Sequence, residues 1–134
     1  MNFTHLYTDC FHQSLKCQDS GILVSKWLPA TSSMSLEMFK ASCLTMASLA
    51  QRHEGQSVLI DGTDFYMGQP EDSFWAWRGE NISPIYNSAG VKKFAFLWKE
   101  GSPLPPNSGS ISEPDKFPTT HFTNRDEAMA WLGE

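Results

Sequence analysis

The chain has 134 residues, 40% of them hydrophobic, and a formal net charge of -5 at pH 7. This length and composition are typical of one soluble globular domain over residues 1–134 rather than of a disordered chain. The Lys and Arg side chains are scattered and form no basic stripe, so we expect no nucleic-acid partner.

The sequence also argues against membrane insertion and export. No stretch approaches the roughly 18 to 20 apolar residues of a spanning helix, and residues 1–16 lack the basic start and apolar segment of a signal peptide. We therefore expect no membrane span and a cytoplasmic location. The three cysteines form an odd set and are interpreted as reduced thiols, although a pairing of two of them stays open: Cys10, Cys17 and Cys43.

The first expected elements are strands. Residues 11–17 alternate with a period of two, as in a half-buried strand, with Phe11, Leu15 and Cys17 on one face and His12 and Ser14 on the other. The turn sequence QDSG leads to residues 22–28, which are apolar on both faces, as in a more central strand paired with the first. A further short strand is expected at 3–7.

A helix is expected over residues 33–53, because its apolar side chains fall on one face: Leu36, Phe39, Cys43, Met46, Ala47 and Ala50. Ser33 or Ser35 can cap its start, and Gly55 suits the left-handed position after its end. A strand at 57–60 follows at once. The helix is therefore a crossover between two strands, which favours parallel pairing.

A second helical stretch over residues 71–89 follows Pro70 and ends at Gly90. Pro84 lies inside it and has no N–H to donate to the helix. We therefore expect the stretch to be kinked or split near Pro84.

The remaining elements lie after residue 91. Residues 92–98, KKFAFLW, are the next expected strand, and residues 99–118 hold five prolines, four serines and two glycines, which predicts a long irregular loop. A short closing strand at 119–122 follows. Thr123 and Asp126 resemble a capping pair at the start of a terminal helix.

This order of elements predicts an α/β fold, with a mixed sheet of about four to six strands and about three helices packed against it. Four segments carry a family resemblance: WLP, VLIDGTDF, NSAGVKKFAFLW and FPTTHFTNRDEAMAWL. In order and spacing they are similar to the SpoIIAA-like proteins, small bacterial proteins of STAS-like fold that are related to the CRAL-TRIO lipid-binding domains. The resemblance covers roughly residues 11–132.

The resemblance implies a non-catalytic regulatory or ligand-binding module, often a homodimer, that acts through a regulatory protein partner or a small ligand. The CRAL-TRIO relationship suggests an alternative, a carrier of an apolar or lipid ligand. A small enzyme of unrecognised type is the alternative from another class.

Some proteins of this fold carry a phosphorylatable serine in an Asp-Ser turn that opens a helix. The nearest match is Asp72-Ser73, but Phe74 and Trp75 stand where the pattern has a small residue and glycine. Ser73 is therefore a weak candidate phosphoacceptor. The alternative is that Asp72 or Ser73 only favours the first helical turn.

The stretch SVLIDGTDFYMGQ, residues 57–69, runs from an apolar strand into Asp61 and Asp64. A calcium loop starting at Asp61 would place Tyr66 where glycine is required, and the stretch has no lysine for a phosphate-binding loop. The favoured interpretation is turn chemistry at the end of a strand. The alternative makes Asp61 and Asp64 hydrogen-bond acceptors for a ligand, because crevices in open α/β sheets lie beyond the carboxyl ends of strands.

No metal, cofactor or catalytic motif emerges. The helical RHEGQ segment resembles a zinc-protease motif, but Ser57 stands where the second histidine is required. On a strand, Cys10 and His12 face away from Cys17, so these three side chains do not form a ligand set. There is no serine-nucleophile elbow, and the four histidines are interpreted as structural.

The aromatic density of the second helical stretch is the strongest functional signal. Its apolar side chains spread over about 180° of arc, which is wider than one sheet face covers. One interpretation is a pocket lined by Trp75, Trp77 and Tyr86, with Arg78 binding an anionic or polar ligand head. The alternative packs Trp75 or Trp77 on the 99–118 loop or on a second subunit. That loop is either a lid or a mobile surface segment.

Overall fold

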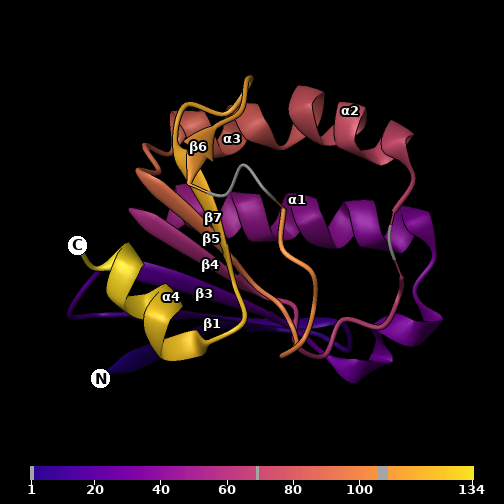
Figure 1. The fold of residues 1–134 in the computed structure, drawn as a ribbon, viewed down its shortest axis with the longest axis horizontal. Helices are drawn as coiled ribbons and strands as arrows, with labels where there is room; N and C mark the ends of the chain where they lie inside the picture. The colour runs from indigo at the N-terminus through magenta and orange to yellow at the C-terminus, as the bar shows by residue number, and fades with distance from the viewer. Residues whose placement is uncertain (1, 69, 106–108) are drawn as a thin grey trace.

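The computed structural model of the chain describes residues 2–68, 70–105 and 109–134. Its centre is a mixed sheet of seven strands in the order β1-β2-β3-β4-β5-β7-β6 (Figure 1). The strands are β1 (Phe3–Thr8), β2 (His12–Cys17), β3 (Ile22–Trp27), β4 (Ser57–Asp61), β5 (Lys93–Leu97), β6 (Ser110–Ile111) and β7 (Pro118–Phe122). Antiparallel pairs β1–β2 and β2–β3 lead into four parallel neighbours, β3, β4, β5 and β7.

Helices cover both faces of this sheet. They are the short 3-10 helix η1 (Pro29–Ser33), α1 (Leu36–Arg52), α2 (Asp72–Asn81), α3 (Ser83–Ser88) and α4 (Arg125–Leu132). Figure 1 shows α1, α2 and α3 on one face and α4 on the other. Pro84 does split the second helical stretch, because α2 ends at Asn81 and α3 begins at Ser83.

The α/β prediction is confirmed, with more strands than expected. At one edge of the sheet, β1 is the short extra strand expected at 3–7, whereas the additional strand is β6 at the other edge, which lies inside the 99–118 segment. That segment was expected to be irregular throughout. Residues Ser110 and Ile111 instead pair with β7 and extend the sheet by one short strand.

The sheet separates two hydrophobic cores. Alternate residues of β4 point to opposite faces, so Val58 and Ile60 join the core under α1 to α3, and Leu59 joins the core under α4. All five residues of β4 are buried, as expected for a parallel strand covered on both faces.

The side chains of β2 that are buried on the side of α1 are polar rather than apolar. His12 and Ser14 are fully buried on the side of α1, opposite Trp27 and Ser25 of β3. The hydroxyls of Ser14 and Ser25 lie 2.8 Å apart and form a hydrogen bond, which removes the cost of burying both. Cys17 is also buried, on the other face, so β2 is enclosed on both sides.

Two helix boundaries differ from the sequence-based expectation. The left-handed residue after α1 is Glu54, with φ 54°, whereas Gly55 does not have a positive φ. The N-cap of α4 is Asn124, whose side chain accepts a hydrogen bond from the N–H of Glu127 at 3.0 Å, so the capping pair with Thr123 was wrong. Ser35 does cap α1, accepting a hydrogen bond from the N–H of Met38 at 3.2 Å.

Candidate ligand-binding cavity

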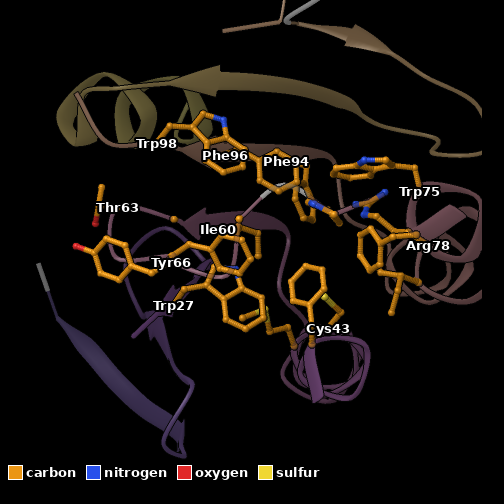
Figure 2. A pocket seen from close by; sticks show the side chains of 18 of the residues that line it. Trp27, Cys43, Ile60, Thr63, Tyr66, Trp75, Arg78, Phe94, Phe96 and Trp98 are labelled. Carbon is orange, nitrogen blue, oxygen red and sulfur yellow. The ribbon is translucent and has the colours of Figure 1, made fainter. Parts of the chain in front are cut away.

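A cavity of about 390 Å³ lies between the sheet and the helices α1, α2 and α3 (Figure 2). The sheet contributes alternate side chains that point to this face, Ile60 from β4 and Phe94 and Phe96 from β5. Gly62 and Thr63, which follow β4, and Trp98, which follows β5, extend the lining. The cavity therefore lies toward the carboxyl ends of two parallel strands, where open α/β sheets commonly bind ligands.

Contacting aromatic rings close one side of the cavity. The ring centroids of Trp27 and Phe39 are 5.4 Å apart, and each lies within 5.4 Å of the Phe65 ring. Phe39 also contacts Phe74 of α2 at 4.7 Å. This cluster joins strand, helix and loop residues, so the side of the cavity next to α1 is rigid and apolar.

Helix α2 contributes Trp75 and Arg78, which lie three residues apart and therefore on the same face of the helix. Trp75 is 47% exposed, which is unusual for tryptophan and places its indole at the rim. Tyr86 of α3 is buried, and its ring meets that of Phe94 edge-on at 5.0 Å. Burial strongly raises the pKa of the Tyr86 hydroxyl, so it stays protonated.

Arg78 and Lys99 are the charged residues of the cavity lining, and the charge of Arg78 is already compensated. Its Nη1 lies 3.4 Å from Oδ2 of Asp115 and donates a hydrogen bond to it. The same nitrogen is 3.4 Å from the Ser83 hydroxyl, and the guanidinium lies 5.5 Å from the centroid of the Phe94 ring. Arg78 is therefore held against an aromatic ring and a carboxylate, which limits its attraction for an anionic ligand.

Cys43 of α1 is the thiol in the cavity lining. Burial raises its pKa to about 12, although the positive charge of Arg78 opposes this. At neutral pH the thiol is protonated and is a poor nucleophile. The arrangement gives no support to covalent catalysis by Cys43.

A second cavity of about 310 Å³ shares part of this lining. Trp75, Arg78, Phe96 and Trp98 line both cavities. The residues found only in the second are more polar and come from β7 and the 99–118 segment: Pro105, Ser110, Ser112, Asp115, Thr119 and His121. The described parts of the 99–118 segment therefore line a cavity and pack on the rest of the domain.

His121 belongs to a polar contact at the edge of the second cavity. The indole Nε1 of Trp98 donates a hydrogen bond to Nδ1 of His121 at 2.9 Å. Burial lowers the pKa of His121, so the ring is neutral at pH 7 and can accept this bond. The bond fixes the orientation of both rings.

Three of the six residues proposed from the sequence line the first cavity: Trp75, Arg78 and Tyr86. Trp77 lies instead on the side of α2 that meets α1. Its ring is 5.8 Å from that of Phe74 and 5.2 Å from Nζ of Lys40. The alternative, in which Trp75 or Trp77 packs on the 99–118 segment or on a second subunit, stays open for Trp75, which lines the second cavity together with Pro105.

Asp61 and Asp64 do not line either cavity. Asp61 is 3% exposed and lies on the α4 side, where Oδ2 is 3.3 Å from Nη1 of Arg125. Its Oδ1 accepts hydrogen bonds from the backbone N–H and the hydroxyl of Thr63, at 3.0 and 2.7 Å. Asp64 is half-buried, and its Oδ2 lies 3.7 Å from Nζ of Lys26. Both carboxylates thus have local partners, as the turn interpretation of this stretch expects.

The sequence-based site missed the sheet side of the cavity. Phe94, Phe96 and Trp98 alternate along KKFAFLW, which signalled a strand but not which of its faces meets a cavity. Asp115 lies in a segment of loop composition, so nothing in the sequence paired it with Arg78. Gly62 contributes as well, because a Cβ there would lie 3.3 Å from the ring of Trp98.

Ser73 is exposed in the first turn of α2, whose N-cap Glu71 makes no side-chain capping bond. The helix begins at Asp72, so neither Asp72 nor Ser73 is its N-cap.

Within the described residues, no group of three His, Cys, Asp or Glu side chains is arranged to hold a metal ion. No helix in the same residues has the length and apolar character to cross a membrane. In comparisons with known proteins, no family model, curated protein or solved structure matches this chain.

Proposed function

We propose that the chain is a non-catalytic ligand-binding module that holds a small, largely apolar molecule between its sheet and the helices α1 to α3. The observation that carries this proposal is the largely apolar cavity of about 390 Å³ under α2, whose charged lining residues are Lys99 and the charge-compensated Arg78. Cavities of this size and lining are typical of small-molecule sites. The resemblance to SpoIIAA-like proteins of STAS-like fold is consistent with this role and remains a proposal.

An enzyme and a ligand carrier would each require a different arrangement of side chains in the cavity. A small enzyme would require titratable groups to converge in the cavity, for example a trio of Arg78, Asp61 and His121 within hydrogen-bond reach of one another. Asp61 lies on the opposite face of the sheet and pairs with Arg125, so this trio does not assemble. A carrier of a small apolar ligand requires an apolar space under α2, and the first cavity, which is open to solvent on one side, supports that form of the proposal.

The biological setting also belongs to this proposal. We infer a cytoplasmic protein, because all three cysteines are free thiols in the described chain. A homodimer and a regulatory protein partner stay predictions from the resemblance. Phosphorylation of Ser73 also stays a prediction, for which the exposure of that side chain is a necessary condition.

Native mass spectrometry tests the proposal directly. The chain is purified under gentle conditions and weighed before and after denaturation. We expect a mass excess in the native spectrum that disappears on denaturation, as a noncovalent ligand would give. A bare chain whose thermal stability also fails to respond to added naphthalene or decanoate would contradict the proposal.

Two matched variants locate the ligand. Cys43→Leu enlarges a side chain of the cavity lining, so it should abolish the mass excess. Ala41→Leu places the same side chain on the exposed face of α1, so it should retain the excess. Loss of the excess in both variants, or in neither, would place the ligand elsewhere.

A further inference from the structure

Three nearly parallel aromatic rings stack against one another where the two cavities meet. The ring centroid of Phe96 is 5.6 Å from that of Trp98 and 5.1 Å from that of His121, and both pairs are within 10° of parallel. Trp98 and His121 are parallel to within 7°. Phe96 of β5 pairs with His121 of the adjacent parallel strand β7, and Trp98 directly follows β5, so the sheet positions all three rings.

Trp75 reaches the same space from α2. Its indole lines both cavities together with Phe96 and Trp98 and remains 47% exposed (Figure 2). Large exposed aromatic side chains at the rim of a cavity commonly contact ligands. A planar ring in this space can extend the stack while its edge touches Trp75.

The Arg78–Asp115 ion pair supplies the polar part of the same space. Both side chains are mostly buried, with exposed fractions of 15% and 11%, and both line the second cavity. Within the described part of the chain, Oδ1 of Asp115 is buried and has no hydrogen-bond partner. Arg78 uses only Nη1 in its described hydrogen bonds. The pair is therefore neutral as a unit, yet retains one unpaired acceptor and several unpaired donors.

We propose that this shared space takes a planar heteroaromatic ligand whose edge carries a hydrogen-bond donor beside an acceptor, as in a lactam or an imide. The ring extends the aromatic stack on Phe96 or Trp98. Its N–H donates to Oδ1 of Asp115, and its carbonyl accepts from Arg78. The proposal rests on the ligand-binding function proposed above and specifies the chemical class of the ligand.

Other ligand classes fit this space less well. An anionic head at Arg78 also faces the carboxylate of Asp115, 3.4 Å from the guanidinium, so repulsion offsets the attraction. A hydrocarbon leaves the buried Oδ1 of Asp115 without a donor, which is costly in a desolvated site. The polar edge of a lactam satisfies both residues of the pair without adding net charge.

Four probes separate these classes. Carbostyril is a bicyclic lactam, N-methylcarbostyril lacks its N–H donor, naphthalene lacks both polar groups, and decanoate is a flexible anion. Each is titrated into the full chain, and binding is followed by the NMR signals of the indole N–H groups of Trp75 and Trp98. We expect carbostyril to bind about tenfold more tightly than N-methylcarbostyril, the scale of one hydrogen bond to a charged group.

Variants of the pair and the rim test the assignment. In Asp115→Asn the single amide oxygen accepts the hydrogen bond from Arg78. An NH2 group, which can only donate, then stands where the wild-type chain has the unpaired Oδ1. The preference for carbostyril should therefore disappear, and decanoate should bind more tightly because the guanidinium loses its compensating charge. Asp126→Asn, on the exposed first turn of α4, is the matched control and should change neither. Trp75→Phe should weaken carbostyril binding, whereas Trp77→Phe on the same helix should not.

The outcomes distinguish the two proposals. Equal binding of carbostyril and N-methylcarbostyril to the wild-type chain would overturn the lactam assignment and leave the ligand-binding function standing. Tighter binding of decanoate than of carbostyril would do the same. If no probe shifts either indole signal, both proposals fail. The comparison of the two lactams uses the unmodified chain, so it holds even where Asp115→Asn does not fold.

Discussion

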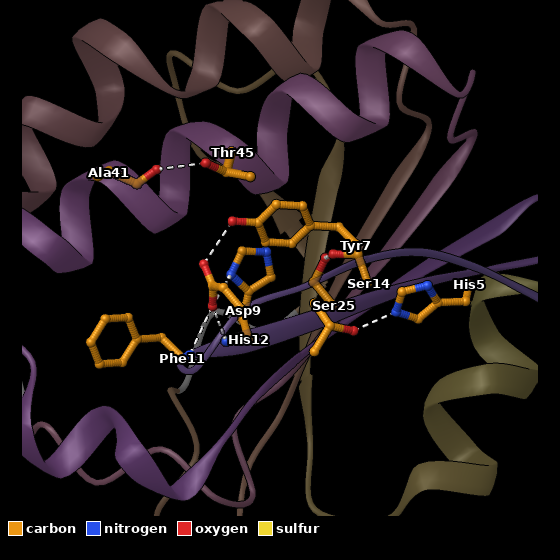
Figure 3. Close-up of polar contacts among 10 residues, drawn as sticks. His5, Tyr7, Asp9, Phe11, His12, Ser14, Ser25, Ala41 and Thr45 are labelled. Atoms are coloured by element: carbon orange, nitrogen blue, oxygen red, sulfur yellow. Dashed lines mark hydrogen bonds and ion pairs between the residues drawn. The ribbon is translucent and has the colours of Figure 1, made fainter.

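Nδ1 of His12 lies 3.8 Å from Oδ1 of Asp9, and in the described chain neither ring nitrogen of His12 makes a hydrogen bond (Figure 3). The imidazole is fully buried, stacked 4.8 Å from the ring of Tyr7 and edge-on to the ring of Trp27 at 6.0 Å. Burial lowers the pKa of His12, although the charge of Asp9 opposes this. Burial acts to raise the pKa of Asp9, but hydrogen bonds from Tyr7 and from the N–H groups of His12 and Phe11 outweigh it and lower that pKa.

We expect acidification to destabilise the fold through His12. Its pKa in the folded chain lies below the ordinary value of 6.5. Below that value the unfolded chain takes up a proton that the folded chain does not. The free energy of unfolding should therefore fall as pH drops from about 7.5 to about 5.5, by at most about 1.4 kcal/mol per pH unit from this residue. Urea denaturation across this pH range measures the slope.

The variant His12→Phe keeps an aromatic ring between Tyr7 and Trp27 and removes the titrating group. Its unfolding free energy should depend less on pH than that of the wild-type chain. Part of the dependence should remain, because burial also lowers the pKa of His121. His5→Gln, at an exposed position on β1, should keep the wild-type slope. An unchanged slope in His12→Phe would show that His12 does not carry the effect.

His12 also illustrates what the sequence revealed about the fold. Period-two alternation correctly predicted a strand near residues 12–17, and the crossover helix correctly implied parallel pairing of β3 with β4. The face of β2 was not predictable, because alternation gives the period of a strand but not the direction of the core. The Ser14–Ser25 hydrogen bond and the ring contacts of His12 compensate for burying the polar series, and these partners are distant in sequence.

The candidate site was predictable on its helical side and not on its sheet side. The dense aromatic pattern identified Trp75 and Arg78, because both lie on one short helix whose spacing is visible in the sequence. Asp115 and His121 come close to them only through the order of the parallel strands and the path of the 99–118 segment. Asp61 was considered for the same site because it ends a strand. Whether its side chain points toward α2 or α4 depends on the pleat of β4.

The residues after α1 give a paired prediction about stability. Glu54 is in the left-handed region at φ 54°, which is unfavourable for residues with a Cβ. Glu54→Gly should therefore raise the free energy of unfolding, by up to about 1 kcal/mol. Gly55→Ala should lower it by about 1 to 3 kcal/mol, because the new Cβ would lie 3.2 Å from the Cβ of Leu23. Urea denaturation of both variants tests this assignment, and the reverse order of stabilities would contradict it.

Asp61→Asn should reduce stability and leave ligand binding unchanged. The amide can still accept from Thr63, but it loses the charge that faces Arg125 at 3.3 Å. Because Arg125 is 45% exposed, solvent screening limits the expected loss to about 1 kcal/mol. Thermal denaturation measures the loss, and the indole N–H signals of Trp75 and Trp98 report binding of naphthalene. Weaker naphthalene binding by Asp61→Asn would show that Asp61 contributes to the ligand site and would contradict this prediction.

The three thiols should differ sharply in reactivity. Cys10 is exposed, Cys17 is buried, and burial raises the pKa of Cys43 to about 12. Hydrogen bonding to Ser20 lowers the pKa of Cys17, but its side chain is only 1% exposed. Because a thiol must be both ionised and accessible to react, a disulfide reagent at neutral pH should label Cys10 in the native chain. Cys17 and Cys43 should react only after denaturation. Peptide mapping of the labelled chain identifies the sites, and rapid native labelling of Cys43 would mean that the cavity opens to solvent far more than its lining implies.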